Sequence, residues 1–146
     1  LEKEFGPEAL AIDLKTFKTL LAKRPKAKIK PLLMDQKFIA GIGNIYSDEI
    51  LFAAKIHPLR QVRTLTIKEI KKILQNARKI LKKAIQRHGS SVQYYIDAYG
   101  GKGDYVKYHK VYQKEGKPCP RQDDGIIQRI KINGRSAHFC PNCQII

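Results

Sequence analysis

The chain has 146 residues, the length of one ordinary domain and enough to bury a hydrophobic core. Its 42% hydrophobic and 29% charged residues are typical of globular proteins and exclude a disordered chain. No stretch approaches the roughly 20 apolar residues of a membrane-spanning helix. The first residues also lack the basic start and apolar run of a secretory signal, so a cytoplasmic location is expected.

Basic residues dominate the charge balance: 29 Lys and Arg against 13 Asp and Glu give a net charge of +16. Such a charge predicts an anionic partner, nucleic acid first and an acidic membrane surface second. The three cysteines cluster near the end of the chain, at positions 119, 140 and 143. Clustered cysteines in an otherwise cysteine-free chain indicate a metal site in a reducing compartment rather than a disulfide scaffold.

The first predicted helices precede residue 36. Asp13 is a suitable N-cap, and apolar residues at helical spacing follow it until Arg24 and Pro25 end the segment. Pro31 then occupies a favoured first position of a helix, which predicts a short helix over residues 31–35.

A glycine turn follows this short helix. Gly41 and Gly43 interrupt the helical pattern and allow a tight turn with positive φ. Apolar spacing returns from Ile45 until His57 and Pro58, so the expected arrangement is helix, double turn, helix.

The longest predicted element runs over residues 66–87. Thr66 and Glu69 form a capping box, apolar residues then recur at helical spacing, and Gly89 ends the run. Basic residues cover the opposite face of this helix, and we expect that face to be solvated rather than a direct DNA contact. They are Lys68, Lys71, Lys72, Arg78, Lys79, Lys82, Lys83 and Arg87.

The last third of the chain changes in character. A short helix is predicted from Ser90 to Asp97, and a glycine-rich loop follows over 100–103. A strand is then expected from Tyr105 to Tyr112. Alternating runs over 126–132 and 135–139 flank an Asn-Gly pair, the strongest short hairpin signal.

The cysteines surround this hairpin in a pattern typical of a metal site. Cys140 and Cys143 form an intact C-x-x-C pair, whereas Cys119 begins a similar half site that lacks its second cysteine. Two such half sites meet tetrahedrally in a zinc ribbon. We therefore predict one structural zinc ion per chain, held by Cys119, Cys140 and Cys143, because so small a hairpin has little core of its own.

Two questions about this finger stay open at the level of sequence. The fourth ligand could be Asp123, Asp124, His138 or water. Alternatively, the hairpin could be metal-free and held together by its own apolar side chains, which are Ile126, Ile130, Ile132 and Phe139.

A second constellation lies at the glycine turn. Backbone N–H groups of Gly41 to Gly43, the positive end of the following helix and the Asn44 side chain together suit an anion. Glycines often only make turns, but in a chain of charge +16 a phosphate ligand is favoured.

Two stretches resemble one known family, the formamidopyrimidine-DNA glycosylases. Residues 30–58 are similar to its helix–two-turn–helix signature, with the sequence KPLLMDQKFIAGIGNIYSDEILFAAKIHP. The tail from Val111 to Gln144 resembles its C-terminal zinc finger, including GRS and FCPNCQ. The similarity runs from about Phe5 to Gln144, and both motifs occur in family order.

The resemblance implies a mainly α fold: a helical helix–two-turn–helix domain over 1–103, followed by a small β-hairpin zinc-finger module, zinc-ribbon-like, over 104–146. It also implies base-excision repair of oxidised purines by a glycosylase and AP lyase that binds damaged double-stranded DNA as a monomer. The family's nucleophile is an N-terminal proline amine, followed by a glutamate. This chain opens with Leu1 and Glu2 and has no Met before Met34, so we expect the catalytic half to be missing. No catalytic residue is assigned, and the chain alone is expected to be inactive.

Several positions carry the family's DNA contacts by resemblance. Lys30 and Asn44 match residues that contact DNA at or beside the lesion, Tyr112 matches a tyrosine near a phosphate, and Arg135 matches the finger arginine. Gly43 belongs to the Gly43–Asn44 turn, which is expected to hold a phosphate. The loop over 98–105 corresponds to one that closes over an extruded base. The pattern departs from the family over 122–125, where a cysteine is lost and one residue is gained.

One alternative class stays open. A basic RNA-binding or ribosome-associated module could share only the finger. Competition between abasic duplex DNA and structured RNA separates the two interpretations.

Overall fold

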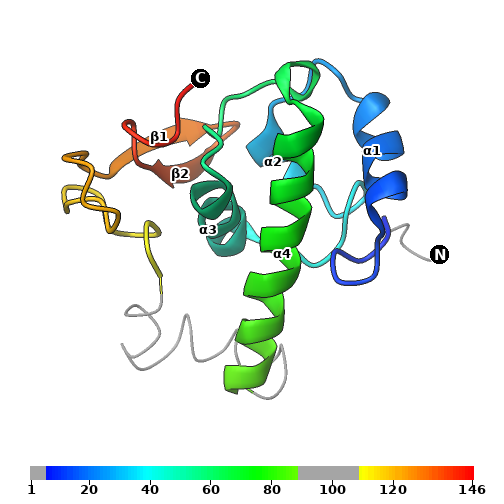
Figure 1. Cartoon of the computed structure of the whole chain (residues 1–146), viewed down its shortest axis with the longest axis horizontal. Helices are drawn as coiled ribbons and strands as arrows, with labels where there is room; N and C mark the ends of the chain where they lie inside the picture. The colour runs from blue at the N-terminus through cyan, green and yellow to red at the C-terminus, as the bar shows by residue number, and fades with distance from the viewer. Residues whose placement is uncertain (1–5, 89–108) are drawn as a thin grey trace.

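A computed structural model describes residues 6–88 and 109–146 of the chain. Among these residues it contains four α-helices, one short 3₁₀ helix and one two-stranded sheet (Figure 1). In chain order they are α1 (Leu14–Ala22), α2 (Ile29–Met34), α3 (Asn44–Ala54), η1 (Val62–Thr64), α4 (Ile67–His88), β1 (Gln128–Ile132) and β2 (Arg135–Phe139). The predicted helix over 90–97, the loops over 98–105 and 100–103, and residues 105–108 of the predicted strand lie outside the described residues.

Side-chain caps start two of the helices where the sequence predicts them. The Asp13 carboxylate accepts a hydrogen bond from the Thr16 backbone N–H at 2.8 Å, which begins α1. Thr66 and Glu69 cap α4 reciprocally, with backbone-to-side-chain distances of 2.9 and 3.1 Å. The Arg60 guanidinium donates two hydrogen bonds to the same Glu69 carboxylate, at 2.8 and 3.1 Å, and so connects the start of α4 to the preceding loop.

The turn between α2 and α3 differs from its prediction in one detail. Gly41 has a φ of 101°, in the left-handed region that favours glycine. Gly43, however, has a φ of −102° and is the N-cap of α3. The expectation of positive φ at both glycines is therefore wrong for Gly43. Helix α3 also ends earlier than His57, because Lys55 adopts a left-handed C-cap with a φ of 63°.

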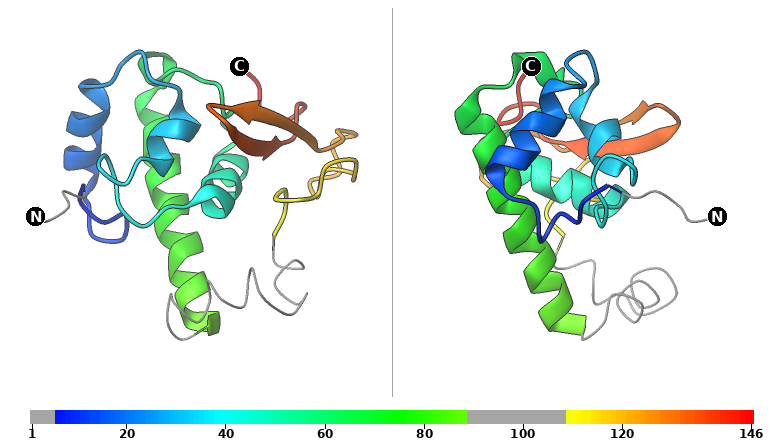
Figure 2. Two further views of the ribbon diagram at one scale, coloured as in Figure 1. Left: turned by 180° about the vertical axis from the view of Figure 1, so that it is seen from behind. Right: turned by 90° about the vertical axis from the view of Figure 1, so that its right-hand side faces the viewer.

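Apolar side chains from all four α-helices form one core. Phe17, Leu33, Ile50 and Ile73 are each at most 1% exposed and represent α1, α2, α3 and α4 in turn. Figures 1 and 2 show α4 crossing the other helices, with the hairpin next to α3 and at the opposite end of the molecule from α1. No described helix is long and apolar enough to cross a membrane.

The predicted hairpin is confirmed. Strands β1 and β2 pair antiparallel from Gln128 opposite Phe139 to Ile132 opposite Arg135. Asn133 and Gly134 join them with φ values of 51° and 82°, the two positive angles that a tight two-residue hairpin turn requires.

A second apolar cluster holds the hairpin region against α3. It consists of Phe52, Val111, Cys119, Ile127 and Cys140. The strand predicted through Tyr112 does not reach that residue, since the backbone over 109–112 bends and turns instead. The reason is that a side chain of α3 takes the N–H groups which a strand partner would need, as described below.

Candidate nucleic-acid interface and metal centre

The N-terminal end of α3 presents the elements of an anion site. Its N-cap, Gly43, makes no side-chain capping bond, and Asn44 occupies the first helical position. The Asn44 side-chain oxygen is buried and has no hydrogen-bond partner. The positive end of the helix dipole and an incompletely paired amide therefore lie at the same point.

Lys30 lies beneath this helix end rather than on the surface. The residue is 1% exposed, and its ammonium donates to the Asp48 carboxylate at 2.6 Å and to the Ser47 hydroxyl at 2.8 Å. A third, longer bond of 3.4 Å reaches the Asn44 carbonyl. Burial lowers the pKa of Lys30, and the attraction of Asp48 opposes that shift. That Lys30 contacts DNA directly stays a prediction, and in this structure its charge is paired with the buried Asp48.

Asp48 also fastens the hairpin to α3. Its second carboxylate oxygen accepts hydrogen bonds from the backbone N–H of His138 at 3.1 Å and from the His138 ring nitrogen Nδ1 at 2.8 Å. His138 belongs to β2, which begins at the exposed Arg135. The charge of Arg135 adds to the lowering of the Lys30 pKa, of which burial is the larger cause.

The neighbouring acid, Glu49, holds the segment that carries Tyr112. Its carboxylate accepts three backbone N–H groups, those of Lys110, Val111 and Tyr112, at 2.8 to 2.9 Å. Burial raises the pKa of Glu49, and the three N–H groups oppose the rise. These bonds explain why residues 110–112 do not form a strand.

Tyr112 is thereby placed against the α3 terminus. Burial raises the pKa of its phenol, and a side-chain hydrogen bond with Asn44 works in the opposite direction. Its ring also meets the His138 ring edge-on at 5.0 Å. Of the five predicted interface residues, Asn44 and Tyr112 are in contact, Gly43 precedes Asn44, and Arg135 begins β2, which packs against α3. Lys30 supports them from below.

The metal-ligand atoms also come together. One ligand atom each from Cys119, Asp123, Cys140 and Cys143 lie within 4.8 Å of one another. Three sulfurs and a carboxylate are ligands that zinc accepts, so the residues fit a structural zinc ion. Among the open candidates for fourth ligand, the His138 ring is engaged by Asp48.

Without a metal, the Cys119 and Cys143 thiols favour their protonated form. Burial raises the pKa of Cys119, and it raises that of Cys143 to about 12. Because zinc binds thiolates, metal binding here would release protons. A bound ion would hold the segment around Cys119 to the end of the hairpin.

Arg121 joins this centre to α3, and sequence reasoning missed it. Its guanidinium donates to the Cys143 sulfur at 2.9 Å and to the Phe52 carbonyl at 2.7 Å. It also lies 3.9 Å from the centroid of the Phe52 ring. Asp48 and Glu49 were missed as well. The only feature of the sequence that could have pointed to them is that two acids stand side by side in a predicted helix of a strongly basic chain.

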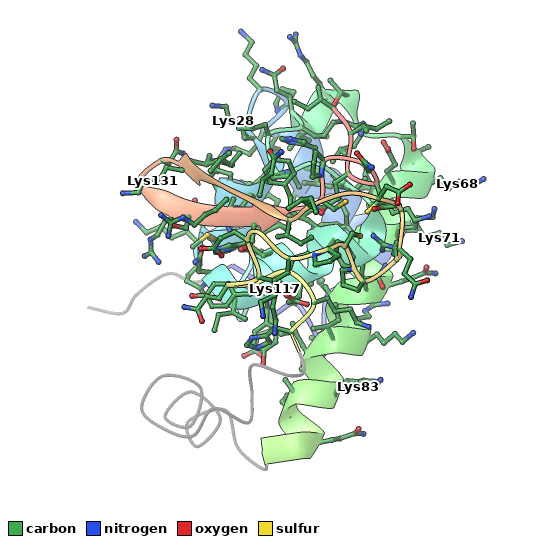
Figure 3. All side chains as sticks on the ribbon, turned by 90° about the vertical axis from the view of Figure 1, so that its left-hand side faces the viewer. Lys28, Lys68, Lys71, Lys83, Lys117 and Lys131 are labelled. Carbon is green, nitrogen blue, oxygen red and sulfur yellow. The ribbon has the colours of Figure 1, made fainter. Side chains whose placement is uncertain are left out.

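Six lysines of the basic face of α4 are exposed, as expected of a solvated face: Lys68, Lys71, Lys72, Lys79, Lys82 and Lys83. Arg78 differs, because it is half-buried and its guanidinium donates to the Ile12 carbonyl. Figure 3 shows Lys68, Lys71 and Lys83 pointing away from the side where the hairpin residue Lys131 lies. These α4 lysines therefore lie on another side of the molecule than Lys131 of the hairpin.

Comparison with known proteins identifies relatives for nearly the whole chain. The family model "Formamidopyrimidine-DNA glycosylase H2TH domain" matches residues 5–95, and "Zinc finger found in FPG and IleRS" matches residues 124–145. Formamidopyrimidine-DNA glycosylases of Pelotomaculum thermopropionicum and Listeria innocua are each 45% identical to this chain over 97% of its length, and the matches cover 51% and 52% of their own lengths. The chain thus spans about half the length of the curated relatives it matches.

Solved structures agree with this assignment. The Lactococcus lactis Fpg in complex with DNA containing an abasic site has a TM-score of 0.81 at 40% identity, covering 96% of this chain and 51% of that one. The same protein in complex with FAPY-dG containing DNA has a TM-score of 0.81 at 42% identity, with the same coverage. Since the helix–two-turn–helix model alone matches more than half of the residues, the chain belongs to the formamidopyrimidine-DNA glycosylase family.

Proposed function

We propose that this chain is the DNA-binding portion of a base-excision repair glycosylase and AP lyase that acts on oxidised purines in duplex DNA. The names of its relatives and the damaged DNA bound in its structural neighbours support this assignment. The lesion chemistry belongs in this proposal to the other half of the full-length protein. In this proposal the chain itself binds the phosphate backbone around the lesion.

The proposal is supported by the hydrogen bond between Tyr112 and the Asn44 side chain, and by the position of Arg135 at the start of β2, the strand that packs against α3. Gly43 and Asn44 offer N–H groups at a helix N-terminus, which suit a phosphate. Tyr112 offers a hydroxyl, and Arg135 offers an exposed guanidinium that can pair with phosphate in a bidentate way. Lys30 is a positioning residue that holds the helix end through Asn44 and Asp48.

In the same proposal the chain has two parts, a helical domain over 1–103 and a zinc-ribbon-like module over 104–146. A structural zinc ion organises the second part and thereby the direction of Arg135. Phosphate contacts of this kind fix position but read little base sequence, so lesion choice rests mainly with the other half.

Fluorescence anisotropy with an abasic duplex at several salt concentrations tests the interface. Arg135→Ala should weaken binding by about 1.5–3 kcal/mol, which is roughly 10- to 150-fold. It should also reduce the slope of log K against log salt by about 0.9, the effect of one lost phosphate neutralisation. Lys71→Ala removes the same charge from the exposed face of α4, which points away from Lys131 of the hairpin, and should change both quantities little.

The outcome that contradicts the interface is an equal loss in both variants, because binding would then depend on overall charge alone. A preference for structured RNA over the abasic duplex would instead favour an RNA-binding module and overturn the repair assignment.

A further inference from the structure

Two pairs of ligand atoms in the finger stand close to the spacings of a filled tetrahedral site, and all four lie within 4.8 Å of one another. With zinc–sulfur bonds of about 2.3 Å and a zinc–oxygen bond of about 2.0–2.2 Å, two sulfurs lie about 3.8 Å apart and a sulfur and an oxygen about 3.5–3.7 Å apart. The Cys119 and Cys143 sulfurs are 4.0 Å apart. The two Asp123 carboxylate oxygens lie 3.6 and 3.5 Å from the Cys140 sulfur.

The backbone around Asp123 is shaped to bring its carboxylate there. Gln122 and Asp124, on either side of it, have φ values of 59° and 65°, in the left-handed region that such residues seldom adopt. The Asp123 carboxylate accepts the Gly125 N–H at 2.9 Å, and its carbonyl accepts the Asn142 side-chain amide at 2.8 Å. The Gly125 N–H thus holds the Asp123 carboxylate, while Asn142 holds its backbone.

Gly125 makes room for this approach. A Cβ atom at this position would lie 2.6 Å from the Cys140 sulfur and 2.9 Å from an Asp123 carboxylate oxygen, closer than real contacts allow. Gln122 takes the position at which a C-x-x-C pair would place its second cysteine, and it is exposed. The next residue, Asp123, faces the three sulfurs in its place.

We propose that Asp123 is the fourth ligand of the finger, so that the metal is held by three thiolates and one carboxylate rather than four thiolates. Zinc with these four ligands carries a formal charge of −2, from +2 for the ion, −3 for the thiolates and −1 for the carboxylate. The Arg121 guanidinium, 2.9 Å from the Cys143 sulfur, offsets part of that charge. Asp124 is exposed and lies outside the group of four, and the His138 ring is bonded to Asp48.

Cobalt(II) substitution in the full chain tests this ligand set without any DNA or enzyme assay. The near-ultraviolet sulfur-to-cobalt absorbance grows with the number of bound thiolates, and the visible bands report a tetrahedral site. Asp123→Cys should raise the near-ultraviolet absorbance per bound cobalt by about one third, the step from three thiolates to four. Asp123→Ala should keep that absorbance but weaken zinc binding by more than about tenfold in chelator competition.

Asp124→Asn is the matched control, since it changes a neighbouring exposed carboxylate, and it should leave the cobalt spectrum and the zinc affinity unchanged. The proposal is overturned if Asp123→Ala binds zinc as tightly as this control with an unaltered visible spectrum. It is equally overturned if Asp123→Cys binds cobalt without any gain in thiolate absorbance. The cysteine variant supplies a full ligand set, so it keeps the test decisive if the alanine variant fails to fold.

Discussion

Replacing Asp48 by asparagine should strongly destabilise the protein, because it removes the charge that pairs with the buried Lys30 ammonium. The Asp48 carboxylate is 1% exposed and pairs at 2.6 Å with Lys30, which is equally buried. Asparagine keeps the size of the side chain but removes the charge that compensates the Lys30 ammonium. A buried ion that loses its partner costs about 3–5 kcal/mol. Total stabilities are about 5–15 kcal/mol, so the loss is a large fraction of the whole.

Urea unfolding followed by circular dichroism measures this effect. With an m-value of at most about 3 kcal/mol per molar urea, a loss of 3 kcal/mol lowers the midpoint by at least about 1 M. Asp13→Asn is the control, because asparagine caps a helix as well as aspartate does and should shift the midpoint little. A midpoint for Asp48→Asn as high as that of the control would refute the reasoning.

The pairing itself is tested by a double variant. Lys30→Met leaves the Asp48 carboxylate with its two bonds from His138, whereas the double variant with Asp48→Asn leaves no unpaired buried charge. The double variant should therefore be more stable than the sum of the two single losses predicts, by about 0.5–3 kcal/mol. Additive losses would mean that the two residues do not act as a pair.

Three further variants test the caps, the turn and the finger. The Arg60 hydrogen bonds hold the pKa of Glu69 below its usual 4.5. The stabilisation that the ionised Glu69 gives to the folded protein is therefore present above that pH and disappears as the pH falls through the lowered value. Glu69→Gln should cost less than about 1 kcal/mol of unfolding free energy near neutral pH and nothing in strong acid, as measured by urea midpoints. Gly134→Ala forces a side chain into a φ of 82° and should cost about 1–2 kcal/mol, and a loss no larger than that of an exposed strand residue would count against the turn assignment. Arg121→Met should weaken zinc binding roughly 10- to 100-fold in chelator competition, and an unchanged affinity would show that its bond to the thiolate is without effect.

Local signals predicted the elements whose physics is local. The Thr66 and Glu69 capping box, the Asn133–Gly134 turn and the Asp13 cap each depend on residues within three positions of one another. Elements that depend on distant partners were placed less well. Helix α2 begins two residues before Pro31, where the Ile29 N–H bonds the Arg60 carbonyl at 2.8 Å.

The residues of the candidate site likewise fall into those set by short motifs and those that depend on distant partners. The resemblance predicts Asn44, Tyr112 and Arg135 as interface residues, because their positions follow from short motifs. It could not reveal that Lys30 is buried, since that depends on Asp48, 18 residues further along. The missed role of Arg121 likewise rests on carbonyls of α3 that lie 68 and 69 residues away in sequence.

Two adjacent acids of α3, Asp48 and Glu49, lie beside the proposed phosphate-binding residues. An exposed carboxylate there would repel DNA. Asp48, however, is matched by the Lys30 ammonium and two bonds from His138, and Glu49 by three backbone N–H groups. Both acids thus bind protein groups instead of facing the solvent, and the Lys30 charge is neutralised by the same arrangement. Among the five predicted interface residues, Arg135 is then the one whose positive charge is free to release counterions from DNA, so the salt dependence that this group contributes should follow Arg135 and not Lys30.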